Sequence, residues 1–360
     1  MSRLPLPTEE ELETRLRRGE IAFPPLRLTW TASPAKEIDG VLRITWKDQT
    51  VPFAVQCKRA TSPKSLADAA EKSRQRASAA KLQPLIVVPF LNEEALDTLE
   101  AKEVSGIDQC GNGLVIAPGG WFIRKAGSPN LFRPDGVIKN VYRNTSSVVS
   151  RLFLARPAFD SVQEALEEIR RRGGRVTLPT VSKVCKELEN DLVIERSRGG
   201  VTKLRLIQPE KLLAELAANF SSPTVSRRVT GKLRGIEAAE LRKFLKEWAE
   251  KSDNQIVLSG ASSVSAYAVM ARSGVEEYYC SDVFGAVRAL GERFQETDRF
   301  AAVSFLETRD DTVYFDCRDN LTASPVQTFL ELSSGDKRDQ ETADQVRKLV
   351  LNAGAPAGRK

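Results

Sequence analysis

The chain has 360 residues, 41% of them hydrophobic, and a net charge of +6, which is ordinary for a globular protein of two or three domains. It contains no histidine, and this excludes Ser-His-Asp and Cys-His catalysis and histidine-ligated zinc or haem. Any catalysis must therefore use carboxylates, amides and lysine, together with a hard cation such as Mg²⁺.

The five cysteines are far apart and form no C-x-x-C pair, so neither a disulfide framework nor a zinc ribbon is expected. The N-terminal stretch MSRLPLPTEEELETRLRR is polar and acidic, unlike a signal peptide. No apolar run approaches the roughly 20 residues that a membrane helix needs. We therefore expect a cytoplasmic protein without a membrane partner.

Residues 1–127 are expected to form an α/β domain with a mixed sheet. A short charged helix, 9–18, precedes three strand-like runs, and a polar helix then leads to a fully apolar strand. Strands first and then alternating helix and strand are typical of such a domain. After the first helix, the expected elements are strands 26–33, 37–46 and 51–59, helix 65–82, strand 85–90, helix 92–104 and the strand-like runs LVIAP and GWFIRK.

Two short sequences in this domain, E-I-D-G and F-A-V-Q-C-K, supply candidate catalytic residues. Strand alternation puts Gln56 and Lys58 together on one face, with Cys57 on the other. Asp39 lies on the neighbouring strand at a distance that permits convergence. The Asp39 carboxylate, the Gln56 amide oxygen and the Cys57 carbonyl could hold Mg²⁺, while Lys58 would orient a water or stabilise the pentavalent phosphate.

These residues resemble the PD-(D/E)xK nuclease superfamily, in which an Asp is followed by (Asp/Glu)-x-Lys on the next strand. The resemblance implies a restriction-endonuclease-like mixed sheet and a Mg²⁺-dependent DNA endonuclease. It assigns Asp39, Gln56 and Lys58 as catalytic residues, with Asp39 and Gln56 as the metal ligands.

Gln56 departs from the superfamily pattern, because it replaces the middle carboxylate and so weakens Mg²⁺ binding. Some active members, such as transposon end-cutting subunits, also carry Gln at this position. The candidates for the glutamate that family nucleases place on the first helix are Glu10, Glu11 and Glu13. The alternative is that Lys58 is a solvated surface group and that the pattern has arisen by chance.

Residues 105–116, SGIDQCGNGLVI, contain a glycine-rich turn. The sequence G-N-G favours positive φ angles in a tight connection. The segment lacks the Lys-Ser/Thr pair of a P-loop and the G-x-G-x-x-G of a dinucleotide site. A structural turn is therefore favoured over a phosphate cradle.

Residues 146–219 are expected to form a winged helix-turn-helix, after a connector at 128–145 that is rich in Pro, Gly and Asn. Ser161 and Glu164 fit a capping box that opens the second of three helices. The apolar stripe of the third helix, about 180–191, comprises Val181, Val184, Leu188 and Leu192. Two alternating runs joined by Gly199-Gly200 then predict a β-hairpin.

Polar and basic side chains of the third helix and the hairpin are expected to contact the base edges and phosphates of double-stranded DNA. From Arg175 to Arg205 the chain has seven basic and four acidic residues, a local balance of +3. The expected contact residues are Thr180, Ser182, Lys183, Lys186, Arg196, Arg198, Lys203 and Arg205. Two alternatives stay open: the winged helix serves protein contacts, or its lysines are an ordinary solvated face.

Residues 233–352 are expected to form a second α/β domain, after a connector at 220–232 and before a disordered tail at 353–360. The expected elements are helix 236–251, strand 255–260, helix 261–274, strand 276–283, helix 284–294, strands 300–307 and 312–319 and two closing helices. This segment resembles a nucleotidyltransferase-like domain, but its sequence S-G-A-S-S-V is not followed by the D-x-D carboxylate pair of active members. We therefore expect no catalysis here, but a surface for a partner or for a homodimer.

Several features together resemble the AbiEi-family antitoxins of type IV toxin–antitoxin systems. They are the nuclease-like N-terminal domain, the G-x-D-x-x-G-N turn, the winged helix and the closing Q-x-x-L-E-L segment. The resemblance implies a DNA-binding protein, a nucleotidyltransferase-like C-terminal domain and a cognate toxin as partner. Some members of this group also repress their own operon, and the resemblance implies the same role as an option here.

The leading expectation is thus a double-stranded DNA-binding regulator, either an antitoxin or a transcriptional repressor. The first alternative is a Mg²⁺-dependent DNA endonuclease whose substrate is positioned by the winged helix. The second is a toxin-binding protein that acts through its C-terminal domain.

Overall fold

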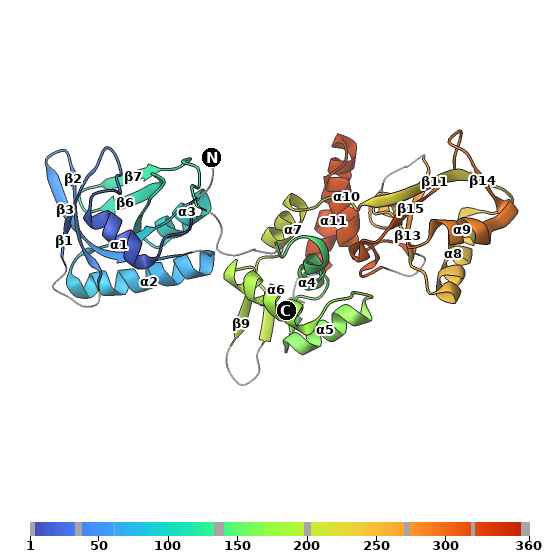
Figure 1. Cartoon of the computed structure of the whole chain (residues 1–360), viewed down its shortest axis with the longest axis horizontal. Coiled ribbons are helices and arrows are strands. Elements are labelled where there is room, and N and C mark those ends of the chain that lie inside the picture. The colour runs from blue at the N-terminus through green and yellow to red at the C-terminus, as the bar shows by residue number, and fades with distance from the viewer. Residues whose placement is uncertain are drawn as a thin grey trace. The chain divides into compact units, whose positions relative to one another are not determined.

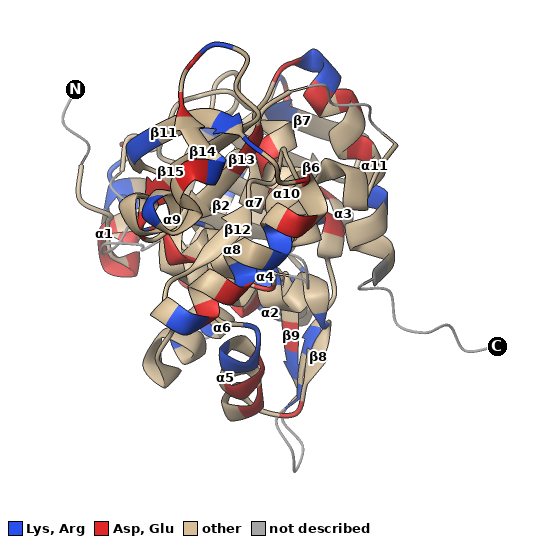
Figure 2. Ribbon diagram, turned by 90° about the vertical axis from the view of Figure 1, so that its right-hand side faces the viewer, with Lys and Arg blue, Asp and Glu red and all other residues tan. Residues whose placement is uncertain are grey.

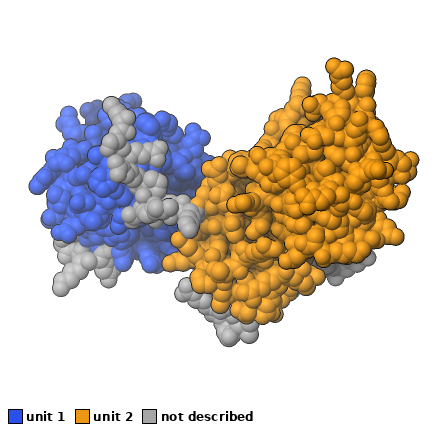
Figure 3. All heavy atoms as spheres, turned by 45° about the vertical axis from the view of Figure 1, so that its right-hand side comes forward, with its two compact units in different colours: residues 1–138 blue, residues 139–360 orange. Residues whose placement is uncertain are grey.

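The computed structural model describes residues 4–32, 38–60, 62–132, 140–197, 203–269, 274–317 and 321–353. Within them the chain is a mixed α/β protein with eleven α-helices and three β-sheets (Figure 1). The chain divides into two compact units, Met1–Ile138 and Lys139–Lys360, called unit 1 and unit 2 (Figure 3). The α/β class expected from the sequence is confirmed.

Unit 1 has three α-helices and seven strands among its described residues. In chain order these are α1 (Glu9–Arg17), β1 (Arg27–Thr31), β2 (Gly40–Trp46), β3 (Gln49–Cys57), α2 (Pro63–Ala80), β4 (Gln83–Val88), α3 (Glu93–Ala101), β5 (Ser105–Asp108), β6 (Gly113–Ala117) and β7 (Trp121–Lys125). The strands form one sheet in sequential order. β3, β4 and β5 pair in parallel and all other neighbours antiparallel, because only α2 and α3 act as crossovers.

The sheet of unit 1 is covered by helices on both faces. On one face, Leu12 of α1 lies in the same buried cluster as Phe53 and Val55 of β3. On the other face, Ala70 of α2 packs with Ile86 of β4. The expected order of helix, three strands, helix and strand is therefore present, and the structure adds β5, which the sequence analysis assigned to a turn.

The two ends of unit 1 lie side by side. Leu4 and Phe132 form a parallel bridge, and the Leu4 amide donates to the Leu131 carbonyl at 2.8 Å. The Ser128 amide donates to Asn112 Oδ1, also at 2.8 Å. The first residues of the expected connector 128–145 thus belong to unit 1, while 133–139 fall outside the described residues.

Unit 2 begins with three helices and a small sheet, which we call the three-helix element. Its members are α4 (Asn144–Ala155), β8 (Ala158–Phe159), α5 (Val162–Arg171), α6 (Leu178–Asn190), β9 (Ile194–Ser197) and β10 (Lys203–Leu206). The strand order is β8-β10-β9, with both pairs antiparallel. The helices and the two hairpin strands were expected, whereas β8 was missed because two residues carry no detectable alternation.

An apolar stripe fixes α6 in this element. Val181, Val184 and Leu188 are buried as expected, and Cys185 is buried beside them. Leu192, expected as the fourth member of the stripe, lies past the helix end with a φ of 58° and is only half-buried. The stripe therefore ends one turn earlier than the spacing predicted.

The rest of unit 2 contains a five-stranded sheet in the order β12-β13-β15-β11-β14. Its elements are α7 (Pro209–Ala218), β11 (Val225–Leu233), α8 (Ala238–Ser252), β12 (Ile256–Leu258), β13 (Glu276–Cys280), α9 (Val283–Leu290), β14 (Phe294–Glu296), β15 (Val303–Thr308), α10 (Pro325–Ser333), α11 (Lys337–Ala353) and the 3₁₀ turns η1 (Val264–Ala266), η2 (Gly291–Arg293) and η3 (Asp311–Tyr314). Among the strand pairs, β13 with β15 is parallel and the others are antiparallel. Side chains of α8 and α9 share a buried cluster with one face of this sheet.

Three segments of this region differ from the sequence analysis. β11 lies largely within the expected connector 220–232, the expected strand 312–319 starts as η3, and the described part of the expected helix 261–274 contains only η1. In the last segment, serine hydroxyls bond the backbone: Ser259 Oγ accepts from the Ser262 amide at 3.1 Å. Such local bonds offer the backbone an alternative to a helix.

One hydrophobic core joins the three-helix element to α10 and α11. Phe153 of α4, Leu330 of α10 and Val346 of α11 belong to the same buried cluster. The expected boundary between a winged-helix domain at 146–219 and a C-terminal domain at 233–352 therefore falls inside one compact unit.

Arg151 of α4 lies inside this core with only 4% of its surface exposed. Its Nη1 donates to the Thr312 carbonyl at 3.1 Å and to Gln327 Oε1 at 2.7 Å. Gln327 Nε2 donates in turn to Glu331 Oε1 at 2.7 Å. Burial lowers the pKa of Arg151 to about 10. The Gln327 amide thus bridges a buried cation and a carboxylate, and we call these three residues the Arg151–Gln327–Glu331 relay.

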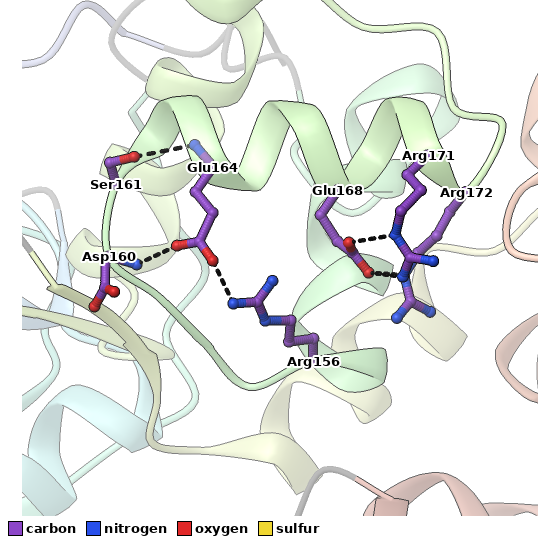
Figure 4. Close-up of polar contacts among 7 residues, drawn as sticks. All are labelled: Arg156, Asp160, Ser161, Glu164, Glu168, Arg171 and Arg172. Carbon is purple, nitrogen blue, oxygen red and sulfur yellow. Dashed lines mark hydrogen bonds and ion pairs between the residues drawn. The ribbon is translucent and has the colours of Figure 1, made fainter.

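Ion pairs hold the C-terminal end of α5 in place (Figure 4). Glu168 Oε1 accepts from Arg171 Nη2 and from Arg172 Nε, each at 2.6 Å. The Arg171 hydrogen bond, followed by that of Arg172, lowers the pKa of Glu168 to about 2. Arg172 Nη1 also lies 2.6 Å from Asp316 Oδ1, which links α5 to the segment after η3.

Candidate nucleic-acid interface and nuclease-like centre

The outer face of α6 carries most of the residues expected to contact DNA. Ser182, Lys183 and Lys186 are exposed, because the buried positions of this helix lie on its other side. Thr180 is half-buried, and its Oγ1 lies 3.0 Å from Thr177 Oγ1. The structure thus brings two ammonium groups and one hydroxyl together on one helix face.

The β9–β10 hairpin divides its basic residues between two faces. Lys203 and Arg205 are exposed and alternate with the buried Leu204 and Leu206. Arg196 pairs in register with Leu204 and so lies on the inner face. Its Nε is 3.9 Å from Glu189 Oε2 of α6.

Only Lys203 and Arg205 of the expected hairpin contacts therefore lie on the exposed face of β10. Arg198 and the Gly199-Gly200 turn fall outside the described residues. The inward position of Arg196 could have been predicted from the sequence. Ile194, two residues earlier, is apolar, and alternate residues of a strand lie on the same face.

The residues of the nuclease-like pattern lie around the C-terminal end of β3. The Asp39 amide donates to the Val55 carbonyl at 3.0 Å, and Asp39 Oδ2 accepts from the Cys57 amide at 2.7 Å. Lys58 Nζ forms an ion pair of 2.9 Å with Glu9 Oε2 of α1. Asp39, Lys58 and Glu9 are thereby brought to one end of the sheet.

The thiol of Cys57 lies close to the charged groups of Asp39, Lys58 and Glu9. The pKa of its thiol is raised above the usual value by burial and then by the negative charges of Asp39, Glu13 and Glu9, with Lys58 opposing them. Cys57 is accordingly a buried, protonated core residue and not a nucleophile.

Glu9 was not among the glutamates that the sequence analysis named for the first helix. Glu11 accepts the Thr8 amide at 2.8 Å in a capping box, and Glu13 pairs with Arg17 one turn later. Both pairings could have been recognised from the T-x-x-E spacing and the i,i+4 spacing. That reasoning would have left Glu9 and Glu10 as the available carboxylates.

Gln56 is buried, with 1% of its surface exposed. Strand alternation places it on the same face as Ala54, which packs against Ala77 of α2. Its amide oxygen has no hydrogen-bond partner within the described part of the chain. Lys58 instead forms its ion pair with Glu9 of α1, whereas the side chain of Gln56 stays buried.

Of the oxygen donors at this end of β3, the Asp39 carboxylate is the one that can reach a loosely held Mg²⁺, because the Gln56 amide oxygen is buried. Across the described residues, no group of three or more His, Cys, Asp or Glu side chains is arranged to hold a metal ion. Asp39 supplies a carboxylate, and Gln56 supplies a buried amide oxygen without a hydrogen-bond donor. Mg²⁺ commonly takes one or two protein oxygens and completes its shell with water and substrate phosphates.

The G-x-D-x-x-G-N turn is built around the carboxylate of Asp108. Asp108 Oδ1 accepts from the Cys110 and Asn112 amides, and Oδ2 accepts from the Leu91 amide and from Asn112 Nδ2, each at 2.8 Å. Asp108 and Asn112 are both buried. Since this turn binds its own backbone, the expectation of a structural turn is confirmed.

No model of a known protein family matches the chain, and no curated protein does. The geometry and the charges described above are therefore the basis for any function. Of the helices in the described part of the chain, none combines the length and the apolar character needed to cross a membrane.

Proposed function

We propose that the chain is a double-stranded DNA-binding regulator, an antitoxin or transcriptional repressor that resembles the AbiEi group. One observation carries this proposal: α6 exposes Ser182, Lys183 and Lys186 on one face while its other face is buried. A recognition helix needs this division, because one side must hold the helix while the other reaches base edges and phosphates.

The topology of the three-helix element supports a winged helix. Its order is helix, strand, helix, helix and two strands, with the hairpin strands directly after α6. The 13 residues of α6 make a rod about 20 Å long at 1.5 Å per residue, which the major groove can accept. Lys203 and Arg205 on β10 would then contact the DNA backbone as the wing does in such domains.

Replacing Lys183 and Lys186 with alanine tests the proposal. We expect the double variant to bind duplex DNA from upstream of its own gene about 10- to 100-fold more weakly, and the salt dependence of binding to become shallower by roughly one unit per lost phosphate contact. Affinity measured by fluorescence anisotropy over a salt series reports both effects.

The matched control replaces two exposed lysines of α8, Lys243 and Lys251, with alanine. It removes the same charge and should leave duplex affinity nearly unchanged. If both double variants lost the same duplex affinity, the loss would be explained by net charge alone. That result would contradict a recognition role for α6.

The second candidate function is a Mg²⁺-dependent DNA endonuclease. The observation that favours it is the ion pair between Lys58 and Glu9, which brings a carboxylate of the first helix to the end of β3 beside Asp39. Asp39 would hold the metal ion, which would polarise a phosphodiester, and water and substrate oxygens would complete the metal's shell. Lys58 would stabilise the negative charge that develops on the phosphate.

We further infer that the C-terminal sheet does not transfer nucleotides. A side chain at Gly260 would meet the Gln327 carbonyl at 2.9 Å, so the S-G-A-S loop lies directly against α10. The Ala261 amide already donates to Glu331 Oε2 at 3.2 Å. The loop that would have to receive a nucleotide phosphate is thus closed by the chain's own carboxylate.

A further inference from the structure

β11 concentrates positive charge in unit 2. Residues 222–236 contain four basic residues and no acidic one. These are Arg227, Arg228, Lys232 and Arg234. Figure 2 shows the corresponding Lys and Arg segments along β11. This charge was not weighed in the sequence analysis, because most of the segment was expected to be a connector.

Three of these residues share one face of the five-stranded sheet. Arg228 and Lys232 alternate with inward positions of β11, and Arg234 continues the same parity. Their face is that of Thr230, whose Oγ1 lies 3.2 Å from Ser304 Oγ of β15. Arg228 and Arg234 are exposed, and Lys232 is half-buried.

Arg227 has a different role. It points to the opposite face, where its guanidinium lies 4.0 Å from the centre of the Phe284 ring and 3.6 Å from Glu307. Arg228 also has an acidic neighbour, Glu277 at 2.7 Å, but its side chain stays 56% exposed. The basic face is therefore formed by Arg228, Lys232 and Arg234.

Phe300, in the loop between β14 and β15, stands beside this basic face. It is 91% exposed, the most of any phenylalanine named among the exposed apolar residues of the described chain. Lys232 Nζ lies 5.4 Å from the centre of its ring. Single exposed apolar side chains are common on protein surfaces, so exposure alone assigns no role to Phe300. What distinguishes this ring is the cation beside it and the basic face that the cation belongs to.

We propose that Arg228, Lys232, Arg234 and Phe300 bind a single strand of nucleic acid. The cations would hold its phosphates and the Phe300 ring would stack on one base, a combination typical of single-strand binding. A duplex keeps the faces of its bases hidden, so this surface takes a different ligand from α6. The proposal goes beyond the duplex-binding function and does not depend on it.

Two other roles for the same residues explain the structure less well. Charges on an edge strand can serve to prevent pairing with another chain, but β11 lies between β15 and β14 in the sheet and is not such an edge. An acidic peptide would satisfy the cations, but it would leave the ring without a stacking partner. A base together with its phosphate satisfies both features.

The test uses the full-length protein and labelled oligothymidylate of about 20 nucleotides, which forms no duplex and covers typical single-strand sites. Phe300→Ala should weaken binding by roughly 5- to 150-fold, the loss expected for one base–aromatic stack. Phe300→Trp should keep the affinity, and its fluorescence should change on binding. Lys232→Ala and Arg234→Ala should each reduce the salt slope by about 0.7, the value for one phosphate of a single strand.

Two controls separate this surface from others. Phe122→Ala removes another exposed phenylalanine, 55% exposed on β7, and should leave oligothymidylate binding unchanged. The α6 variant with Lys183→Ala and Lys186→Ala should lose duplex affinity and keep oligothymidylate affinity, whereas Phe300→Ala should do the reverse. Parallel titrations with oligouridylate distinguish RNA from DNA as the strand bound.

The proposal is overturned if the wild-type protein binds neither oligomer more tightly than polyglutamate of equal length, or if Phe300→Ala changes neither affinity. Because Phe300 is exposed, its replacement should leave the fold intact, and thermal unfolding by circular dichroism checks this.

Discussion

Glu9 and Lys58 are 49 residues apart in the sequence, and their ion pair places a carboxylate and an ammonium group together at the end of β3. Neither residue is unusual alone, since exposed ion pairs contribute little to stability. Their significance comes from Asp39, which is fixed nearby by the Cys57 amide. Lys58 thus has one carboxylate partner, Glu9, which a substrate phosphate would have to displace.

This residue-scale hypothesis predicts Mg²⁺-dependent nicking of supercoiled plasmid DNA. Asp39→Ala and Lys58→Ala should abolish it, and Glu9→Gln should slow it by roughly 100-fold if the carboxylate acts in the transition state. Glu10→Gln, an exposed neighbour on the same helix, is the matched control and should cleave normally. Absence of cleavage of duplex, forked or single-stranded DNA with Mg²⁺ or Mn²⁺ would remove the endonuclease from consideration.

At the scale of elements, the Arg151–Gln327–Glu331 relay joins α4 to α10. The amide of Gln327 accepts from the cation and donates to the carboxylate, so its dipole is aligned between them. Removing the amide leaves Arg151 with the Thr312 carbonyl as its remaining hydrogen-bond acceptor in the described chain. A buried charge that loses a partner is strongly destabilising.

We therefore expect Gln327→Leu to lower the free energy of unfolding by about 3 kcal/mol, the upper end of the contribution of a hydrogen bond to a charged group. Urea denaturation followed by circular dichroism measures the change. Gln345→Leu, at an exposed position of the neighbouring α11, is the control and should alter stability by less than about 0.5 kcal/mol. A similar cost at both positions would mean that the relay contributes nothing specific.

Elements with strong local signals were predictable from the sequence. The stripe of Val181, Val184 and Leu188 located α6, and the alternation of Leu204 and Leu206 located β10. Elements whose state depends on distant partners were not predictable. β11 is a strand because β15 and β14 pair with it, and its basic sequence gives no such indication.

The residues of the candidate sites also divide into those that local sequence signals predict and those that depend on distant partners. The exposure of Lys183 and Lys186 followed from helix periodicity, since the buried stripe dictates which face remains. The inward position of Arg196 could likewise have been predicted, from the apolar Ile194 two residues earlier on the strand. The choice of Glu9 over Glu10 required knowing which side chain meets Lys58. The Phe300 surface could not be predicted from the sequence, because its neighbour Lys232 lies 68 residues earlier in the chain.

At the scale of the whole molecule, unit 2 is expected to unfold as one cooperative body, because the three-helix element shares its core with α10 and α11. Three buried free cysteines report on this within the intact chain. Cys57 lies in unit 1, Cys185 on α6 and Cys280 on β13.

Pulsed thiol labelling across a urea series, read by mass spectrometry, should show Cys185 and Cys280 becoming reactive at the same urea concentration. Gln327→Leu should shift both to lower urea and leave Cys57 unchanged. If Cys185 reacted well before Cys280, the three-helix element would be an independent domain, as the sequence analysis expected.

The adjacency of Leu4 and Phe132 has a consequence for how such a chain can change over evolutionary time. A unit whose two ends lie next to each other can be inserted into a surface loop of another protein, because its two junctions then fall close together. Unit 1 has this property, which is typical of domains that tolerate insertion or circular permutation.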